Sequence, residues 1–497
     1  MDVKEKTNAV PIDKAPPPEA AERKVESVDV ADFALASMSG GGGFLTFARP
    51  EAARINEFTR DMFVNCDNAS ADASNKPFER ARLREFARKE VLNNSYARGL
   101  TLVVSGDTIG RGPTLRVADT VKDANKIEAS FAEWSREINL AEKLRTARVA
   151  KMVDGETFGV FYKDKKLKHP SKFNVKFLES EQVGTPRGLP NCDDIDGIDV
   201  DEYGDPTFYY VFKEHPGSSY RTTFDEYVKV PASSVVHWFR TDRPGQHRGV
   251  TEFAPSLMLF YMLRRYTAAT IDAAETAANF PIVIYTDSPA IENIQRNSAP
   301  FQPITLRRGA ASALPEGWKI GQVKPEQPTT SYGEFKREII AEIARSFCVP
   351  VNVITGDSSK HNYASGRLDY QVYYRAIEIE RKSCEVNVLQ KIFERWYEQT
   401  YLKTAAESFD PKRWNVGGEP PRISWFWDGF AHVDPDKEAK AQAKRLASGT
   451  TTISYEMAKQ GIDPERHFEE LAKERKLLRK LGIEVGYLKG TTNNAPQ

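Results

Sequence analysis

The chain has 497 residues, with 70 lysines and arginines against 70 aspartates and glutamates, so its formal net charge is zero. This length allows roughly two to four domains, and 40% hydrophobic with 28% charged residues is the composition of a globular protein, not a disordered or fibrous one. The zero balance disfavours a protein that grips nucleic acid through a global basic field, but it leaves local basic surfaces open.

Signals for membranes, secretion and disulfide frameworks are not found in this sequence. The most apolar run, Leu257 to Leu263, stops at Arg264, well short of the ~20 residues that a bilayer span needs. The N-terminus has no charged-then-apolar signal peptide, so secretion is not expected. The four cysteines are far apart and form no CxxC pair, which disfavours a disulfide framework or a zinc cluster and fits a reducing compartment.

The N-terminal part begins with a predicted tail and continues with a basic helix. Residues 1–45 contain three consecutive prolines and the run Gly40 to Gly43, and such a segment buries too little to offset its ordering entropy. Residues 80–98 show a helical pattern with six basic residues against Glu85 and Glu90, a local charge of +4. Two interpretations stay open for this helix: a solvated face, or a contact to phosphate or to an acidic partner.

An α+β body is predicted between residues 46 and 254. A helix is expected over 124–150. Short β-branched or aromatic segments bounded by Gly, Pro and Asp turns predict strands, namely Leu100–Val104, Phe158–Tyr162, Val175–Leu178, Phe208–Phe212 and Val235–Phe239.

A helix–insert–helix unit follows. Pro255 to Asn279 is predicted to be one helix, because a proline suits its first turn and another follows its end. Ala269, Ala273 and Ala277 share one face of it, which indicates either core packing or close contact with a neighbouring subunit. A proline-punctuated insert with a strand at Ile282–Tyr285 leads to a second helix that stops before Pro350. The two helices are expected to be antiparallel neighbours.

A polar loop then feeds a long helix. The loop contains Lys360 and His361, and the helix is predicted over Arg367–Leu402, since no Gly or Pro interrupts it. Its apolar residues Val372, Ile379, Val386 and Phe393 repeat every seven positions, which predicts one buried stripe. Three more helices are expected over 435–447, 453–460 and 464–480, and the block Leu471–Lys480 within the last is basic.

Common catalytic and metal motifs are not found. There is no GxxxxGK[ST] phosphate loop, no GxSxG elbow and no HExxH. An acidic cluster at 193–201 lacks the spacing and the closing Glu of an EF-hand. We therefore expect no catalytic residues, no metal and no cofactor, and we do not expect an enzyme.

The order of these features resembles the portal proteins of tailed double-stranded DNA bacteriophages, most closely the lambda-type portal family. The resemblance covers roughly residues 240–485. The residues that carry it are His247-Arg248-Gly249 before Phe253-Ala254-Pro255, then Ile343-Ala344 to Phe347 with Val349-Pro350, Thr355-Gly356-Asp357 and Asn362 to Arg367, and finally Trp427, Asp434-Pro435, Gly449, Gly461 and Asp463.

The resemblance implies a portal-type fold, helix-rich α+β, that assembles into a ring. By position it implies the following regions: a disordered tail at 1–45, a wing at 46–254, a first stem helix at 255–279, a clip at 280–329, a second stem helix at 330–349, a tunnel loop at 350–366, a long wing helix with the following segment at 367–433, a helical crown at 434–490 and a tail at 491–497.

The resemblance also implies a function and partners. A portal is a non-enzymatic homo-oligomeric ring, usually of twelve subunits, at one capsid vertex of the virion, and it is assembled in the host cytoplasm. It seeds head assembly with major capsid and scaffold proteins, docks the large subunit of the terminase motor, and passes double-stranded DNA without sequence specificity during packaging and ejection. It then holds head-completion or adaptor proteins, and no membrane is involved.

Two sets of site residues follow from this resemblance and from the residue patterns. Candidates for the DNA channel are Lys360 and His361 in the loop, and Lys336, Arg337 and Arg345 on the second stem helix. Candidates for subunit packing are Ala269, Ala273, Ala277, Val372, Ile379, Val386 and Phe393. The competing interpretations are another capsid-associated connector or adaptor, and a DNA-packaging nuclease or motor component, which would need a nucleotide cradle or a carboxylate cluster.

Overall fold

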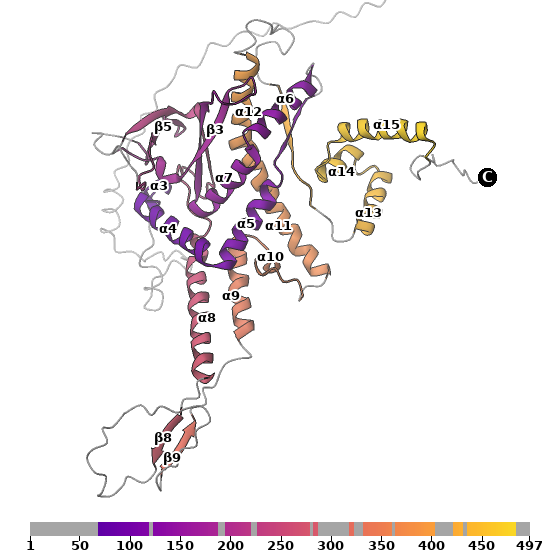
Figure 1. Cartoon of the computed structure of the whole chain (residues 1–497). Coiled ribbons are helices and arrows are strands. Elements are labelled where there is room, and N and C mark those ends of the chain that lie inside the picture. The colour runs from indigo at the N-terminus through magenta and orange to yellow at the C-terminus, as the bar shows by residue number, and fades with distance from the viewer. Residues whose placement is uncertain are drawn as a thin grey trace, which may run out of the picture. The chain divides into compact units, whose positions relative to one another are not determined.

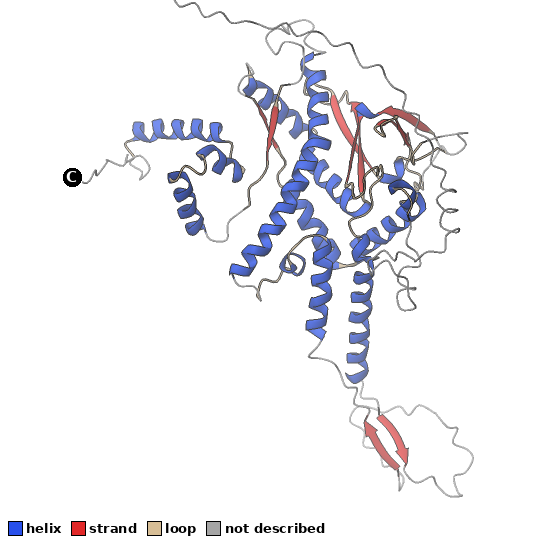
Figure 2. Ribbon diagram, turned by 180° about the vertical axis from the view of Figure 1, so that it is seen from behind, coloured by secondary structure: helices blue, strands red, loops and turns tan. Residues whose placement is uncertain are grey.

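The computed structural model describes residues 68–118, 123–186, 194–219, 226–278, 282–286, 318–322, 332–359, 363–402, 421–430 and 435–483. Helices predominate and are accompanied by small antiparallel sheets (Figures 1 and 2), so the helix-rich α+β class is confirmed. The predicted tails, Lys360, His361 and most of the insert at 280–329 lie outside the described residues. Within the described part, no helix is both long enough and apolar enough to cross a bilayer.

The first helices correct one strand prediction. After the short α3 (Ala71–Ser74), α4 spans Pro77–Asn93 and α5 spans Ser95–Ile109, so Leu100–Val104 is helical. Asn94 caps α5 by accepting a hydrogen bond from the Tyr96 amide at 3.0 Å. Leu100 and Val104, four residues apart, are buried where α5 packs against α7 and α11, and burial of a helical face outweighs the strand preference of Val.

The helix predicted over 124–150 is two helices, α6 (Ala124–Glu137) and α7 (Leu140–Asp154). Asn139 between them has a φ of 54°, a conformation that a continuous right-handed helix cannot contain. The break lets α6 bury Phe131 and Trp134 while α7 turns Leu144 and Ala147 into the same core.

Four predicted strands in the α+β body are confirmed within two residues. The strands β2 (Glu156–Lys163), β3 (Phe173–Leu178) and β7 (Val235–Phe239) form one antiparallel sheet in the order β3-β2-β7, which packs against α7. A second sheet has the order β4-β5-β6, and β1 pairs with β10. The strands of these two are β4 (Ile198–Val200), β5 (Pro206–Phe212), β6 (Tyr227–Pro231), β1 (Thr114–Val117) and β10 (Ile423–Phe426).

The helix–insert–helix unit forms a helical hairpin. A 3-10 turn at Ala254–Ser256 leads into α8 (Leu257–Ala278), and α9 spans Tyr332–Ser346. The ring centroid of Tyr266 in α8 lies 4.8 Å from that of Phe335 at the start of α9. The ring centroid of Phe253, before α8, lies 4.9 Å from that of Phe347, just after the end of α9. The two helices are therefore antiparallel neighbours, as predicted. Of the insert, β8 (Ile282–Thr286) and its partner β9 (Trp318–Gln322) are described.

The long helix begins earlier than predicted and is not uniformly α-helical. A short α10 (Val351–Thr355) precedes it; α11 (Tyr363–Cys384) and α12 (Gln390–Tyr397) are then joined and followed by π-helical turns at Glu385–Leu389 and Glu398–Leu402. The predicted buried stripe is wrong for three of its four residues. Val372, Ile379 and Val386 are 55%, 66% and 58% exposed, whereas Phe393 is fully buried.

The π turn explains why the seven-residue repeat changes sides. A π turn adds a residue to one turn of helix, so Phe393, which follows the turn at Glu385–Leu389, points to a different side than Val372 and Ile379 before the turn and Val386 at its start. The buried side of this helix instead carries Tyr373, Ile377, Cys384, Val388, Leu389 and Ile392. Around Phe393 and Trp396 it joins Phe131, Trp134 and Phe173 in an aromatic core.

The three C-terminal helices are confirmed as α13 (Pro435–Ala447), α14 (Ile453–Lys459) and α15 (Pro464–Leu481). Arg445 of α13 bonds to Glu456 of α14 at 2.8 Å. Arg116 of β1 bonds to Asp463, which precedes α15, at 3.1 Å. Ion pairs thus connect these helices to each other and to β1.

Candidate functional site

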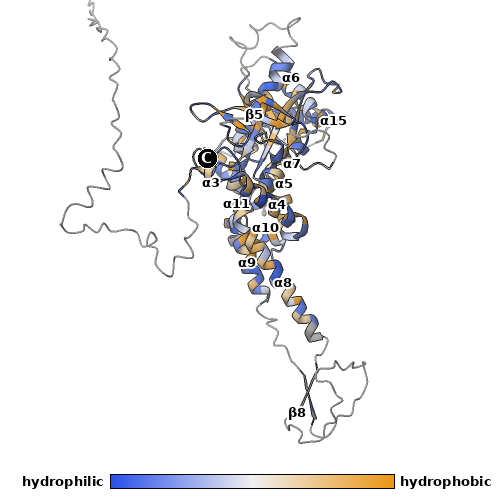
Figure 3. Ribbon diagram, turned by 90° about the vertical axis from the view of Figure 1, so that its left-hand side faces the viewer, coloured by the Kyte–Doolittle hydropathy of each residue, from blue (hydrophilic) through white to orange (hydrophobic). Residues whose placement is uncertain are grey.

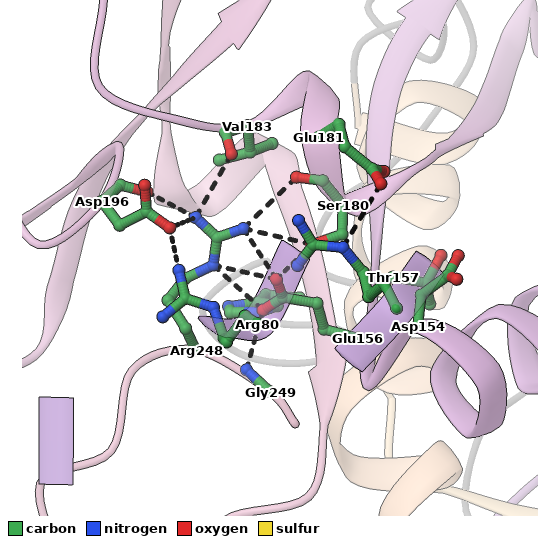
Figure 4. A network of polar contacts seen from close by, with 12 residues as sticks. Arg80, Asp154, Glu156, Thr157, Ser180, Glu181, Val183, Asp196, Arg248 and Gly249 are labelled. Carbon is green, nitrogen blue, oxygen red and sulfur yellow. Dashed lines mark hydrogen bonds and ion pairs between the residues drawn. The ribbon is translucent and has the colours of Figure 1, made fainter. Parts of the chain in front are cut away.

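An arginine just before the helical hairpin makes more hydrogen bonds than any other side chain in the described part of the chain. Arg248 follows β7, and its side chain is only 2% exposed. Its guanidinium reaches two carboxylates and three backbone carbonyls from segments far apart in the chain (Figure 4). A buried charge is stable only when it is paired and hydrogen-bonded, so the partners of Arg248 define the site.

Glu156, the first residue of β2, is the main partner. Its carboxylate accepts hydrogen bonds from Arg248 at 2.7 and 3.0 Å and from the Gly249 amide at 2.9 Å. His237 Nε2 lies 3.1 Å from Oε2 of Glu156, and the Ser180 hydroxyl donates to Oε1 of Glu156. Burial alone raises the pKa of Glu156, but the neighbouring Arg248 and the donors hold it well below its ordinary value. The carboxylate is therefore ionised.

Asp196 connects this pair to α4. It accepts from Arg248 at 2.9 Å, and its carboxylate also pairs with Arg80 of α4. Burial, together with the nearby positive charge of Arg248, lowers the pKa of Arg80 to about 10. Asp196 belongs to the acidic cluster noted in the sequence, and the structure uses it to neutralise two guanidinium groups.

The basic residues at 80–98 fall into two groups: Arg82, Lys89 and Arg98 are exposed, whereas Arg80, Arg84 and Arg88 pair with acids inside the chain, a role that neither interpretation offered. Arg80 and Arg84 are buried, and Arg84 bonds to Glu181 at 3.3 Å. Arg88 bonds to Asp154 at 2.7 Å. These arginines hold α4 to the body, so they are not a solvated face and are not presented to an external phosphate. Their acidic partners lie 66 or more positions away in the chain, which a local charge count cannot reveal.

Two glycines allow the close contact between β2 and the segment before the hairpin. Gly155 has a φ of 93°, which favours glycine. A Cβ on Gly249 would collide with the carbonyl oxygen of Gly155, and a Cβ on Gly155 would collide with the backbone of Val250. The two residues therefore have separate structural roles: Arg248 anchors the segment before α8 to Glu156, and Gly249 lets the backbone of this segment approach the backbone of Gly155.

A second buried ion cluster joins the same segment to the long helix. Arg148 of α7 bonds to Glu252 at 3.0 Å and to Glu380 of α11 at 3.4 Å, and Lys151 also pairs with Glu380. Arg148 and Lys151 are almost fully buried. Glu252 precedes α8, so α7, α8 and α11 are fixed to one another near the base of the hairpin.

The hairpin exposes apolar side chains, including Met258, Met262 and Phe335, and Figure 3 shows hydrophobic residues along the ribbons of α8 and α9 in orange. An open groove of about 780 Å³ runs between the two helices. The apolar side chains that line it include Leu259, Met262, Tyr266, Phe335 and Ile339. Exposed Met262 and Phe335 make this groove a candidate surface for contact with another chain.

The structure separates the predicted channel residues on α9. Lys336 is half-buried and lies over the rings of Tyr96 and Tyr332, at 5.3 and 5.6 Å from their centroids. Arg345 is exposed and Arg337 is half-exposed, and they lie on a different side of the helix from Lys336, since successive residues turn by about 100°. Lys336 therefore has a role inside the chain, which the sequence did not indicate.

The predicted packing residues also differ in position. Ala269 is exposed and lines the groove, and Ala273 is half-buried. The side chain of Ala277 lies outside the described residues, as do Lys360 and His361. Phe393 belongs to the buried core and is not available to a neighbouring subunit.

The polar loop is fastened where it is described. Asn352 of α10 is buried, and its Nδ2 donates to the Ser358 hydroxyl at 3.3 Å and to the Tyr370 hydroxyl at 3.2 Å. Ser358 lies before Lys360 and His361 in the chain, and Tyr370 lies after them. One side chain thus connects both arms of the loop.

One cluster has the composition of a metal site but the bonding of an ion-pair network. Glu179, Glu181 and His215 bring ligand atoms within 4.8 Å of one another. Arg88 bonds to both carboxylates, at 3.4 and 3.0 Å. His215 Nδ1 accepts from the Gly217 amide at 3.0 Å, which leaves the proton on Nε2, 3.1 Å from Glu179. The two carboxylates are thus paired with Arg88, while the buried Nε2 of His215 makes no hydrogen bond among the described residues.

Stability is expected to depend on pH through His247. Its Nδ1 lies 2.7 Å from Asp72, and its Nε2 lies 2.8 Å from the Gly204 carbonyl oxygen. Burial lowers the pKa of His247, but these two acceptors outweigh burial and raise it above 6.5. The folded state thus prefers the imidazolium, so this stabilisation is complete below pH 6.5 and is lost as pH rises through the raised pKa.

Urea unfolding across this pH range checks the prediction. Compared with His247→Gln and Asp72→Asn, the wild type is expected to lose additional free energy of unfolding as pH rises through the raised pKa of His247. Parallel profiles for the wild type and the two variants would contradict it.

Comparisons with known proteins agree on one family. The family model described as "Phage portal protein, lambda family" matches residues 60–381. A curated relative, the "Probable portal protein" of Halomonas phage phiHAP-1, is 25% identical over 442 residues and covers 83% of each chain. The matched range of the family model contains the Arg248–Glu156 cluster and both helices of the hairpin.

Solved structures with a similar arrangement come from particle necks and virions. The neck of a native GTA particle computed with C12 symmetry is 13% identical with a TM-score of 0.43, and the match covers 78% of this chain and 94% of that one. The virion of a native gene transfer agent particle is 14% identical with a TM-score of 0.45, with 76% and 93% covered.

Proposed function

Since this chain belongs to the lambda family of phage portal proteins, we propose that it forms a homo-oligomeric ring of twelve subunits at one vertex of the capsid. Double-stranded DNA passes through the ring without sequence specificity when the genome is packaged and ejected. The role is structural and not catalytic. A zero net charge suits a conduit, because each neutralised phosphate strengthens binding and a strongly basic lumen would slow translocation.

The observation that carries this proposal is the helical hairpin with its uncovered apolar groove. The hairpin is joined to the body through Arg248, Glu156 and the cluster around Glu380, while Met262 and Phe335 stay exposed. Removing such apolar surface from water stabilises an assembly by roughly 25 cal/mol for each Å² buried. In a ring, the neighbouring subunit covers it, and Ala269 and Ala273 permit close approach.

The regions of the chain take portal roles in this proposal. Residues 46–254 form the wing, 255–279 and 330–349 the stem helices, 280–329 the clip, 350–366 the tunnel loop, 367–433 the long wing helix with the following segment, and 434–490 the crown. The clip docks the terminase large subunit and later the head-completion or adaptor protein. Major capsid and scaffold proteins meet the ring as the head is seeded, and the assembled protein is part of the virion after assembly in the host cytoplasm.

The channel is proposed to be lined by Lys360 and His361 of the loop and by Arg337 and Arg345 of α9. Asn352 supports the loop assignment, since it ties the residues on both sides of the loop together. Lys336 is a weaker candidate because Tyr96 and Tyr332 already surround its ammonium group.

A charge reversal in the loop tests the channel assignment. Lys360→Glu is expected to leave rings assembled and to reduce packaged or retained DNA, because a carboxylate in the lumen repels phosphate. Ring formation is followed by negative-stain imaging, and packaging by nuclease-protected DNA in particles. Lys165→Glu on the β2–β3 turn is the matched control. Normal packaging by rings of the Lys360 variant would show that this loop does not face the DNA.

A further inference from the structure

The last helix, α15, carries a basic stripe that the proposed channel does not use. Lys473, Lys476 and Lys480 are spaced by three and four residues and are all exposed. Residues at this spacing lie one above another on a helix. Arg479 is exposed beside them, and the half-buried Leu471 and Leu478 lie on the other side.

The ionic surroundings of this stripe differ from those of α4. Arg80, Arg84 and Arg88 of α4 pair with Asp196, Glu181 and Asp154 of the same chain. On α15, Lys473 lies 4.0 Å from Glu469, a weak pair between exposed groups. Within the part of the chain that the structure describes, no carboxylate pairs with Lys476, Arg479 or Lys480. The charge of the stripe is therefore presented to the outside.

The stripe has the dimensions of a phosphate-binding edge. Seven residues separate Lys473 from Lys480, which is about 10.5 Å along the helix axis. Phosphates of one DNA strand follow one another every 3.4 Å along the duplex axis, so the stripe spans about three of them. Lysine ammonium groups bind phosphate as point charges and require no particular base sequence.

We propose that the Lys473–Lys476–Lys480 stripe of α15 binds the phosphate backbone of double-stranded DNA. The inference rests on the proposed DNA conduit, and it adds a DNA-binding element to the loop and α9 residues proposed to line the channel. α15 lies beyond residues 60–381, the range that the family model matches. Arg116, through its bond to Asp463, fixes the first turn of α15 to β1.

Salt-dependent DNA binding tests the stripe directly. The full chain is titrated with a short fluorescent duplex at several salt concentrations, and K473Q/K476Q/K480Q is compared with the wild type. Loss of three phosphate contacts is expected to make the slope of log K against log salt shallower by about 2.7. If the wild type and the variant bind DNA equally near 1 M salt, the wild type is then expected to bind about a few hundredfold more tightly at 0.1 M salt.

Two variants control for nonspecific charge and for folding. K163Q/K165Q/K166Q removes the same charge from exposed lysines near the β2–β3 turn and is expected to keep the wild-type slope. K473R/K476R/K480R keeps the charge and is expected to keep both slope and affinity. Equal slopes for the wild type and the glutamine variant of α15, or an equal loss in the β2–β3 control, would overturn the proposal.

Two further measurements separate DNA binding by the stripe from membrane binding and from ring assembly. If the glutamine variant of α15 loses binding to vesicles of equimolar phosphatidylcholine and phosphatidylserine but keeps its DNA slope, the stripe serves a membrane surface and the proposal fails. Negative-stain images of the same samples report on the ring independently. Rings without the predicted slope change contradict only the stripe, whereas DNA binding without rings contradicts only the portal assembly.

Discussion

Replacing Arg248 with methionine is expected to lower the free energy of unfolding by about 3–5 kcal/mol, because it leaves the carboxylate of Glu156 buried without its cation. Glu156 is fully buried and ionised. The loss is expected to disorganise the segment before α8 first, since the Gly249 amide bonds to the same carboxylate. Urea unfolding of the full chain, followed by circular dichroism, measures the change.

A matched arginine distinguishes this buried pair from an ordinary surface pair. Arg240 bonds to Asp242 at 2.7 Å, with both side chains about half exposed, and Arg240→Met is expected to cost no more than about 1 kcal/mol. Adding Glu156→Leu to Arg248→Met should recover part of the loss, because the unpaired charge is then removed. A cost for Arg248→Met as small as that for Arg240→Met would contradict the anchoring role.

Introducing aspartates at Ile379 and Val386 is expected to convert rings into monomers that remain folded. Both side chains are largely exposed on the long helix, and we propose that a neighbouring subunit covers them together with Val372. A carboxylate at such a contact is expensive to desolvate, and the cost recurs at every interface of the ring. Mass photometry measures the oligomer, and circular dichroism reports on the fold.

The contrast with two other positions makes this prediction specific. Val228→Asp on β6 replaces a similarly exposed valine and is expected to leave rings intact. Phe393→Asp is expected to unfold the chain, because Phe393 packs within 6.0 Å of Phe131 and Trp396 in the aromatic core. Intact rings of the Ile379 and Val386 variant would show that this face of α11 lies outside the subunit interface.

Local signals predicted much of the fold. The Asp-Pro pairs before residues 435 and 464 place the starts of α13 and α15, and four strands of the body follow from their aromatic and β-branched runs. The antiparallel helical hairpin also followed from the pattern. The failures are non-local: Leu100–Val104 is helical because α7 and α11 cover it, and the seven-residue repeat of α11 changes sides at a π turn that no composition signal marks.

The candidate site was harder to predict for the same reason. Arg248 and Gly249 stand out in the sequence only through their resemblance to a family motif, and nothing local indicates that Glu156, 92 positions earlier, is the partner. The arginines of α4 resemble an external binding surface until the fold brings the acids that pair with them close. Of the predicted packing residues on the long helix, Val372, Ile379 and Val386 are exposed and Phe393 is buried, and the part of the first three in subunit packing stays a prediction.

Imaging of the purified full chain by negative-stain electron microscopy tests the central claim most directly. The proposed portal predicts closed rings with about twelve-fold symmetry and a central hole wide enough for a DNA duplex. A monodisperse monomer under the same conditions, or an oligomer without a central channel, would contradict the proposal.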